Sequence, residues 1–534
     1  MKNLLFAFSF IFVCTHLFAQ TSNQLTQTDA GLKYAETITQ SALKNQLTII
    51  ASREMEGRET GTAGQRKAAK YIKGQFMQIG LKPPPSLNSY LQVYPLKKDT
   101  LIPKSLKIGK TKYEFGKDYV VTPGSDNGQE FKSKEIVFAG YGITDTNYDD
   151  YINKDVKGKV VLVVTGEPKE GDQYIISGAK RASRWSFDLS KKASIAKQHG
   201  AVALLVVNPL ADALSASLTN NSRSSNLSLV RADDTTNGKV PVVIITKSVA
   251  QKILNEQQLS SVLSTAKSLM PLNDVVITEK IKTKLEYKKI NIPSESSNVI
   301  GYIEGSDKKD EYVFLTAHYD HLGKRGDAIY YGADDDGSGT VSVIEMAQAF
   351  AKAKEEGNGP RRSVVFMTVS GEEKGLWGSE YYSDHPVFPL ENTTVDLNTD
   401  MVGRIDTERK TGDSLNYVYV IGHNKLSTDL PTISEGVNNK FTHLTLDYKY
   451  DDPEDKNRIY FRSDHYNFAR KGVPILFFYD GMLLADYHKP TDTVDKINFD
   501  LMEKRVRFIF LTAWDMANRD DMVKRDLPLP TATR

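Results

Sequence analysis

Residues 312–321 read Tyr-Val-Phe-Leu-Thr-Ala-His-Tyr-Asp-His, a short apolar strand that runs directly into two histidines and an aspartate. Similar apolar runs follow at 363–369, 417–421 and 473–478, and apolar residues at helical spacing fill 341–351. Continuous apolar strands that alternate with helices indicate a sheet covered on both faces. We therefore expect an α/β fold, a mixed and mostly parallel sheet with helices on both faces.

Residue types that bind metal ions occur where these strands end. In sheets of this kind, ligands sit beyond the carboxyl ends of the strands. The residues found there are His318, Asp320, Glu372, Glu373, Asp400 and His488, together with the turn Gly-Ala-Asp-Asp-Asp-Gly-Ser-Gly at 332–339. Each alone has an ordinary interpretation, such as a surface histidine or a helix cap. Their joint occurrence at one sheet edge predicts a metal site, and nitrogen and oxygen ligands without thiolates suit Zn²⁺, with Mn²⁺ or Co²⁺ as substitutes.

These motifs also carry a family resemblance. The matching strings are His-Tyr-Asp at 318–320, the turn at 332–339, Gly-Glu-Glu-Lys-Gly-Leu-Trp-Gly-Ser at 371–379, Asp-Met-Val-Gly at 400–403 and Tyr-His-Lys-Pro-Thr-Asp-Thr at 487–493. In this order they resemble metallopeptidase family 28, the co-catalytic di-zinc aminopeptidase family. The resemblance implies a zinc aminopeptidase-like fold and two Zn²⁺ ions per chain.

The resemblance also implies a ligand set. By position in the motifs, His318 and Asp400 match the ligands of one zinc ion, and Glu373 and His488 match the ligands of the other. Asp335 matches the carboxylate that bridges the two ions. A carboxylate suits that place because it has two oxygens, one for each cation. No matching position departs from the pattern of the family, which argues against a metal-free relative.

Two further residues match catalytic roles. Glu372 matches the general base, which takes a proton from the attacking water and later gives it to the leaving amine, a contribution of typically ~10²–10⁴-fold. Asp320 matches the group that orients His318, by accepting a hydrogen bond from its non-ligating ring nitrogen. The tetrahedral oxyanion needs a further donor, for which Tyr479 is a candidate, although an ordinary core tyrosine fits the same pattern.

Other polar residues near the motifs have two interpretations each. Ser463-Asp464-His465 and Asp492 are either outer supports of the ligands or capping and loop residues. His321 either lines the rim of the site or is solvated.

A different pattern occupies residues 120–265. Short apolar strands at 135–142, 160–164, 203–207 and 240–245 surround a helix near Ala193, with no cluster of histidines and carboxylates. This region resembles a protease-associated (PA) domain of mixed β/α structure. Before it, residues 55–64 are a glycine-rich loop, and apolar residues at helical spacing from Ala68 to Ile79 predict a helix that stops at Gly80. The segment from Gly57 to Gly80 resembles the N-terminal helix segment of the peptidase family. The expected organisation is a signal peptide at 1–19, an N-terminal part of the peptidase domain at 20–119, a PA-like insertion at 120–270 and the main catalytic part at 271–534.

The N-terminus predicts export. Lys2 precedes a short apolar run that ends near Ala19, as in a secretory signal peptide cleaved there, so we expect a secreted or periplasmic protein. The only cysteine, Cys14, lies inside this segment, so the mature chain would have no disulfide and no thiolate ligand. No later apolar run approaches the roughly 18 residues that span a bilayer, so we expect no integral membrane segment in the mature chain.

Composition narrows the partners. Lysine and arginine number 69 and aspartate and glutamate 67, for a net charge of +2 in 534 residues, which gives no basic field for nucleic acid. Peptides are the expected substrates, and the oligomeric state is left open. The expected function is that of a secreted zinc-dependent aminopeptidase. A carboxypeptidase or dipeptidase of the same family, a glutaminyl cyclase-like enzyme and a non-catalytic receptor-like protein remain alternatives.

Overall fold

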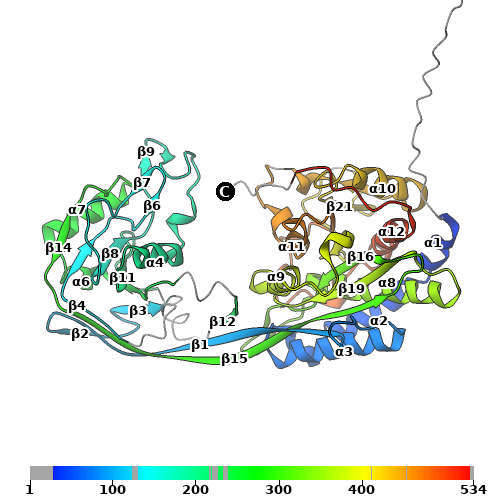
Figure 1. Ribbon diagram of the computed structural model, residues 1–534, viewed down its shortest axis with the longest axis horizontal. Helices are drawn as coiled ribbons and strands as arrows, with labels where there is room; N and C mark the ends of the chain where they lie inside the picture. The colour runs from blue at the N-terminus through cyan, green and yellow to red at the C-terminus, as the bar shows by residue number, and fades with distance from the viewer. Residues whose placement is uncertain are drawn as a thin grey trace, which may run out of the picture.

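The computed structural model describes residues 28–122, 130–215, 218, 226–231, 238–410, 412–452 and 454–528. Figure 1 shows two lobes joined by a pair of long strands, β1 and β15. The predicted signal peptide at 1–19 lies outside the described residues. None of the helices in the described ranges has the length and apolar character needed to cross a membrane.

The larger lobe is built on one mixed sheet with the strand order β12-β1-β15-β19-β16-β20-β23-β21-β22. The bounds are β12 Asn226–Leu229, β1 Leu91–Ile108, β15 Thr283–Ile303, β19 Arg362–Val369, β16 Lys308–His318, β20 Thr393–Thr399, β23 Ile475–Tyr479, β21 Tyr417–Ile421 and β22 Thr445–Asp447. The four central strands β19, β16, β20 and β23 are parallel, whereas β15 and β21 join them antiparallel. The expected mixed sheet is confirmed, with its parallel part at the centre.

Helices cover both faces of this sheet. Phe314 of β16 contacts Tyr382 and Phe468, which belong to α9 (Trp377–Asp384) and α11 (His465–Ala469). On the other face, Phe366 of β19 contacts Phe350 of α8 (Gly339–Glu355), which packs on α12 (Phe499–Asn518). The helices α1 (Thr28–Ala35), α2 (Gln40–Ile50) and α3 (Ala63–Ile79) join this second layer, and α10 (Asp429–Val437) packs beside α12.

The predicted helix after the glycine-rich loop is α3. Thr62 caps its N-terminus by accepting from the amide of Gln65, and its apolar residues at i, i+4 and i+8 (Ala68, Ile72 and Phe76) are buried. The helix ends at Gly80, as expected, because that residue adopts the left-handed conformation with φ of 85°.

The smaller lobe has a six-stranded sheet in the order β14-β5-β8-β11-β13-β3. The bounds are β14 Ile277–Glu279, β5 Ile136–Phe138, β8 Val160–Val164, β11 Ala203–Val207, β13 Val242–Ile245 and β3 Tyr119–Thr122, with helices α4 (Leu189–Gln198), α6 (Lys247–Ala250) and α7 (Glu256–Lys267). Alternate residues of β8 pack into two apolar clusters, one on each face. The first cluster extends from Leu106 to Tyr287, so packing continues across residues 120 and 270, and those boundaries stay a prediction.

The two lobes are connected by the ribbon of β1 and β15. The pairing runs antiparallel from Leu91 opposite Val299 to Ile108 opposite Thr283. A short strand of the insertion, β12, adds to the edge of β1, with Leu229 opposite Leu96. Leu229 packs with Leu96 and Trp377, so the insertion also contacts the larger lobe close to the Glu372-Glu373 segment. The remaining short strands are β2 Thr111–Tyr113, β4 Glu130–Ser133, β6 Thr144–Asp145, β7 Tyr148–Asp149, β9 Lys169–Glu170, β10 Gln173–Tyr174, β17 Gly323–Arg325 and β18 Ala328–Tyr330.

Candidate metal centre

The predicted site residues meet at the carboxyl ends of the central parallel strands. His318 is the last residue of β16, and Asp400 follows β20 directly. Glu372 and Glu373 form a short 3₁₀ turn after β19, and His488 lies in the loop after β23. This is the edge that the sequence indicated, because parallel strands end on the same side of a sheet.

Asp335 lies between two histidines. Its Oδ1 is 3.2 Å from Nε2 of His318, and its Oδ2 is 3.1 Å from Nε2 of His488. His318 Nε2 is also 3.5 Å from Oδ1 of Asp400, while His488 Nε2 is 3.1 Å from Oε2 of Glu373. All five predicted metal ligands are therefore brought together, in two groups that share Asp335.

The electrostatics of this cluster favour cations. Oδ2 of Asp335 and Oε1 of Glu373 are buried and have no hydrogen-bond partner among the described residues, whereas buried polar atoms are nearly always paired. Burial raises the pKa of the Glu372 carboxyl well above its usual range, and the charges of Glu373 and Asp400 raise it further. Unpaired buried oxygens and crowded carboxylates next to imidazole nitrogens form a donor set that suits Zn²⁺. The residues present therefore fit a pair of metal ions.

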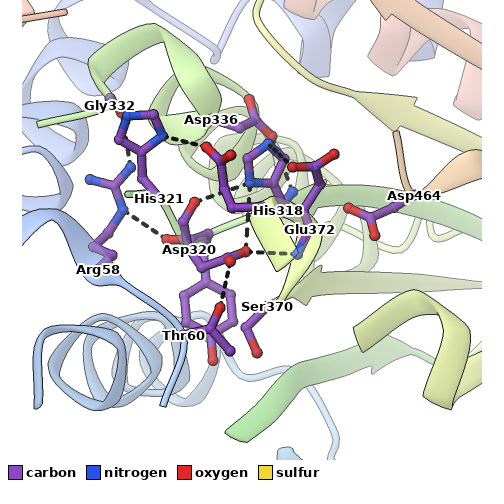
Figure 2. Close-up of polar contacts among 12 residues, drawn as sticks. Arg58, Thr60, His318, Asp320, His321, Gly332, Asp336, Ser370, Glu372 and Asp464 are labelled. Atoms are coloured by element: carbon purple, nitrogen blue, oxygen red, sulfur yellow. Dashed lines mark hydrogen bonds and ion pairs between the residues drawn. The ribbon is translucent and has the colours of Figure 1, made fainter. Parts of the chain in front are cut away.

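Glu372 is placed beside the cluster rather than in it. Its Oε2 is 4.0 Å from Nε2 of His318, and its main-chain amide donates to Oδ1 of Asp320 at 3.2 Å. Figure 2 shows Glu372 next to the His318 ring, with Asp320 below both. A carboxylate at the edge of the donor set is free to exchange protons, as the predicted base must be.

The comparisons with known proteins agree with this geometry. Residues 298–513 match the family model described as Peptidase family M28, and residues 123–253 match the model of the PA domain. The chain carries an M28 peptidase domain. The expected family and the inserted PA domain are thus both confirmed.

One solved structure and two curated proteins are similar to this chain. An aminopeptidase from Aneurinibacillus sp. strain AM-1 has a TM-score of 0.54 at 20% identity, over 94% of this chain and 99% of that one, which shows a shared fold. A protein described as "Probable zinc metalloprotease" from Pyrenophora tritici-repentis is 34% identical over 23% of this chain and 26% of its own length. A "Probable leucine aminopeptidase" from Arthroderma otae is 27% identical over 39% of this chain and 55% of its own. The chain therefore spans about a quarter to a half of these curated relatives.

Asp320 supports the M28 site in a way that differs from the expectation. The Nδ1 atom of His318 lies 3.1 Å from the main-chain oxygen of Asp320 and 3.7 Å from its carboxylate. The nearest acceptor is therefore the carbonyl, not the expected carboxylate. The reason is that the carboxylate is engaged elsewhere, since it accepts from the Thr60 hydroxyl at 2.5 Å and from the Glu372 amide. Asp320 thus links the first ligand, the base and the N-terminal loop.

Arg58 is a support that the sequence did not reveal. Its buried guanidinium donates to four main-chain carbonyls, those of Tyr319, Ile50, Tyr331 and Gly332, at 2.7–2.9 Å. Tyr319 lies between the first ligand and Asp320, and Gly332 begins the turn of the bridging aspartate. In the sequence, Arg58 belongs to a glycine-rich loop and has no predicted role. The carbonyls that accept its hydrogen bonds come from separate segments of the chain, so no sequence pattern marks these contacts.

Asp336 is a second residue without a predicted role. Its carboxylate accepts from the amides of His318, Gly339 and Met401 at 2.8–3.1 Å. The peptide bond before it, from Asp335, is cis. Asp336 thereby holds the ends of two central strands against the start of α8.

The structure shows the contacts of Asp492, Asp464 and His465, each of which had two interpretations in the sequence. Asp492 accepts from the amides of Asp334 and Asp335 at 3.0–3.1 Å, so it supports the turn of the bridging carboxylate. Asp464 accepts from the Ser379 hydroxyl at 2.5 Å, and burial raises its pKa to about 7. His465 contacts the carbonyl of Tyr460, and burial lowers its pKa to about 3. Both side chains are therefore buried, and the choice between their two interpretations stays a prediction.

Tyr479 and His321 are both buried side chains. The Tyr479 hydroxyl is buried without a hydrogen-bond partner among the described residues, and its role as an oxyanion donor stays a prediction. The expectation of a solvated or rim position for His321 is wrong. Its side chain is fully buried, because its ring packs against Gly332 and faces the Glu373 carboxylate.

Proposed function

We propose that this chain is a zinc-dependent aminopeptidase that hydrolyses the first peptide bond of peptides. The observation that carries the proposal is the position of Asp335, whose two carboxylate oxygens face two different histidines. A carboxylate placed in this way can give one oxygen to each of two close ions, as in two-metal hydrolytic sites. The relatives named as a metalloprotease and an aminopeptidase support the same activity.

In this proposal the residues divide into two cation sites. His318, Asp400 and Oδ1 of Asp335 would hold one zinc ion, and His488, Glu373 and Oδ2 of Asp335 would hold the other. When bound, the metal would lower the pKa of a water molecule and polarise the carbonyl of the scissile bond.

Glu372 supplies the proton transfers. The attacking water gives one proton to the Glu372 carboxylate as its oxygen bonds to the peptide carbon. The carbon–nitrogen bond then breaks, and Glu372 returns that proton to the departing amine, so the base ends as it began.

The proposal extends to the location of the protein and to the PA domain. The lysine and apolar run at 1–19 support export with cleavage near Ala19. The PA domain contacts the M28 domain beside Trp377 through β12, so the two domains act as neighbours in this proposal.

The test combines one variant with product analysis. Glu372→Gln is expected to keep two zinc ions per chain and to lose about 10²–10⁴-fold in turnover of aminoacyl anilides. Glu355→Gln, an exposed glutamate at the end of α8, is the matched control and keeps full turnover. Short peptides sequenced from both ends after digestion should lose residues from the amino end. Losses from the carboxyl end would identify a carboxypeptidase, and turnover that survives complete removal of metal would refute the proposal.

A further inference from the structure

His321 is a buried imidazole whose two ring nitrogens make no hydrogen bond within the described residues. Its side chain has no exposed surface. The ring is pressed against Gly332, where an added Cβ would lie 2.5 Å from Cγ of His321. Buried ring nitrogens are seldom left unpaired, and a tightly packed ring is fixed in its direction. The ring nitrogens are therefore directed toward a place where a bound group would pair with one of them.

That place is the second cation site. Nδ1 of His321 lies 2.8 Å from Oε1 of Glu373 and 3.8 Å from Oδ2 of Asp335. Both of these oxygens are also buried and unpaired within the described part of the chain. The 2.8 Å approach is short enough for a hydrogen bond but is not directed as one. A ring nitrogen and a carboxylate oxygen that lie this close without a hydrogen bond are arranged as two neighbouring ligands of one metal ion.

A second imidazole faces the same oxygens from the other side. Nε2 of His488 is 3.1 Å from Oδ2 of Asp335 and 3.1 Å from Oε2 of Glu373. The rings of His321 and His488 stand 5.9 Å apart at 70° to one another. Figure 2 shows the His321 ring beside Gly332, turned toward the centre where His318 and Glu372 lie. Four donors from four separate segments thus surround one point.

We infer that His321 is a fourth protein ligand of the second cation, through Nδ1, beside Asp335, Glu373 and His488. This inference rests on the proposed function only in assuming that two cations bind. The second site then has two imidazoles and two carboxylates, a complete tetrahedral set for zinc. The first site has one imidazole, His318, and the carboxylates of Asp335 and Asp400, which leaves a position open.

The difference predicts an order of loading. Closed four-ligand sites hold zinc structurally, whereas sites with three protein ligands keep a position for water or substrate. The second site is therefore the tighter one and fills first when zinc is scarce. The first site exchanges its ion more readily and offers the open position.

Zinc binding to the full chain tests this inference directly. The protein is stripped with a chelator and reloaded with one equivalent of zinc, and X-ray absorption counts the imidazoles on the ion. The expected count is two for the parent and one for His321→Ala. Titration with zinc should show that the affinity of the tighter site falls by at least tenfold in His321→Ala. His423→Ala is the control, because His423 pairs with Asp451 at 2.7 Å and is predicted to leave both measurements unchanged.

The outcomes separate this inference from the proposed function. If His321→Ala does not fold, His321→Asn replaces it, with circular dichroism of the metal-free protein as the check. An unchanged imidazole count and unchanged affinity in the folded variant would overturn the inference, even if the parent is an active peptidase. Two imidazoles on the first zinc ion of a parent that hydrolyses no peptide would instead remove the proposed function and leave His321 as a ligand.

Discussion

Replacing Arg58 by methionine should destabilise the M28 domain by several kcal/mol. Methionine has a similar length and keeps the apolar packing, but it removes all four hydrogen bonds from the buried guanidinium to the carbonyls around the site. A buried acceptor left unpaired costs about 1–3 kcal/mol. Part of this loss is offset because a buried charge no longer has to be desolvated. The expected net loss is about 3–5 kcal/mol, near the values for breaking a buried charged interaction.

The assay is thermal unfolding of the metal-free proteins, so that loss of zinc does not contribute to the shift. A net loss of this size should lower the Tm of the M28 domain by about 6–20 °C. Arg53→Met is the control, since Arg53 is exposed at the start of the same turn and should melt within 1–2 °C of the parent, or about 0.5 kcal/mol. A folded Arg58→Met protein that melts as the parent does would refute the argument that this side chain holds the ligand loops together.

Three further outcomes are expected. Gly332→Ala should lower zinc affinity at least tenfold by titration, because Gly332 has φ of 55° and an added Cβ would lie 2.3 Å from the carbonyl of Asp335; unchanged affinity would contradict this. Burial raises the pKa of Asp396 to about 8 from 3.8. Between pH 4 and pH 8 the folded protein therefore keeps a proton on Asp396 that the unfolded chain has lost. The free energy of unfolding falls as the pH rises through this range, by up to ~1.4 kcal/mol per pH unit. Asp396→Asn should therefore gain stability relative to the parent from pH 4 to pH 8 in denaturant titrations, and parallel pH profiles would disprove the assignment. A strong chelator should abolish peptide hydrolysis, with recovery on adding Zn²⁺ and none on adding Ca²⁺, which prefers six to eight oxygen ligands.

Much of the central sheet could be predicted because its strands are buried on both faces. Such strands are continuous apolar runs, as at 312–317, and their ends fix where the following polar residues must gather. The stop of α3 at Gly80 was predictable for a similar reason, since the left-handed cap favours glycine.

The long ribbon could not be predicted in the same way. β1 and β15 are 18 and 21 residues long, and their ends alternate between buried and less buried residues where they pack on a lobe, as at 92–96 and 283–287. The stretches between the lobes, 97–104 and 288–295, carry several lysines and have no buried residue among the side chains that the structure describes. Without a buried face, these stretches offer no burial pattern from which a strand could be predicted. Their partners are also far apart in sequence, so the pairing has no local signal.

The sequence predicted no contact of Arg58 with the site and placed His321 wrongly at the rim or in solvent, and both failures share one physical cause. Arg58 and His321 both act through distant groups: main-chain carbonyls in one case and carboxylates from other segments in the other. An exposed arginine or histidine has the same appearance in a sequence as a buried one. Only the folded contacts, such as those that both side chains make with Gly332, distinguish the two cases.

The ribbon makes the PA domain separable from the peptidase by a single cut and join. Lys97 and Pro293 are register partners across β1 and β15, so a short turn between them would close an ordinary β-hairpin and leave each central strand beside its present neighbours. A gene could gain or lose the whole PA domain at this one junction without changing the pairing of the catalytic strands. A peptidase without the PA domain would lack Leu229, which packs on Tyr94 and Trp377. The exposed aromatic patch should then cause the shortened protein to associate or precipitate.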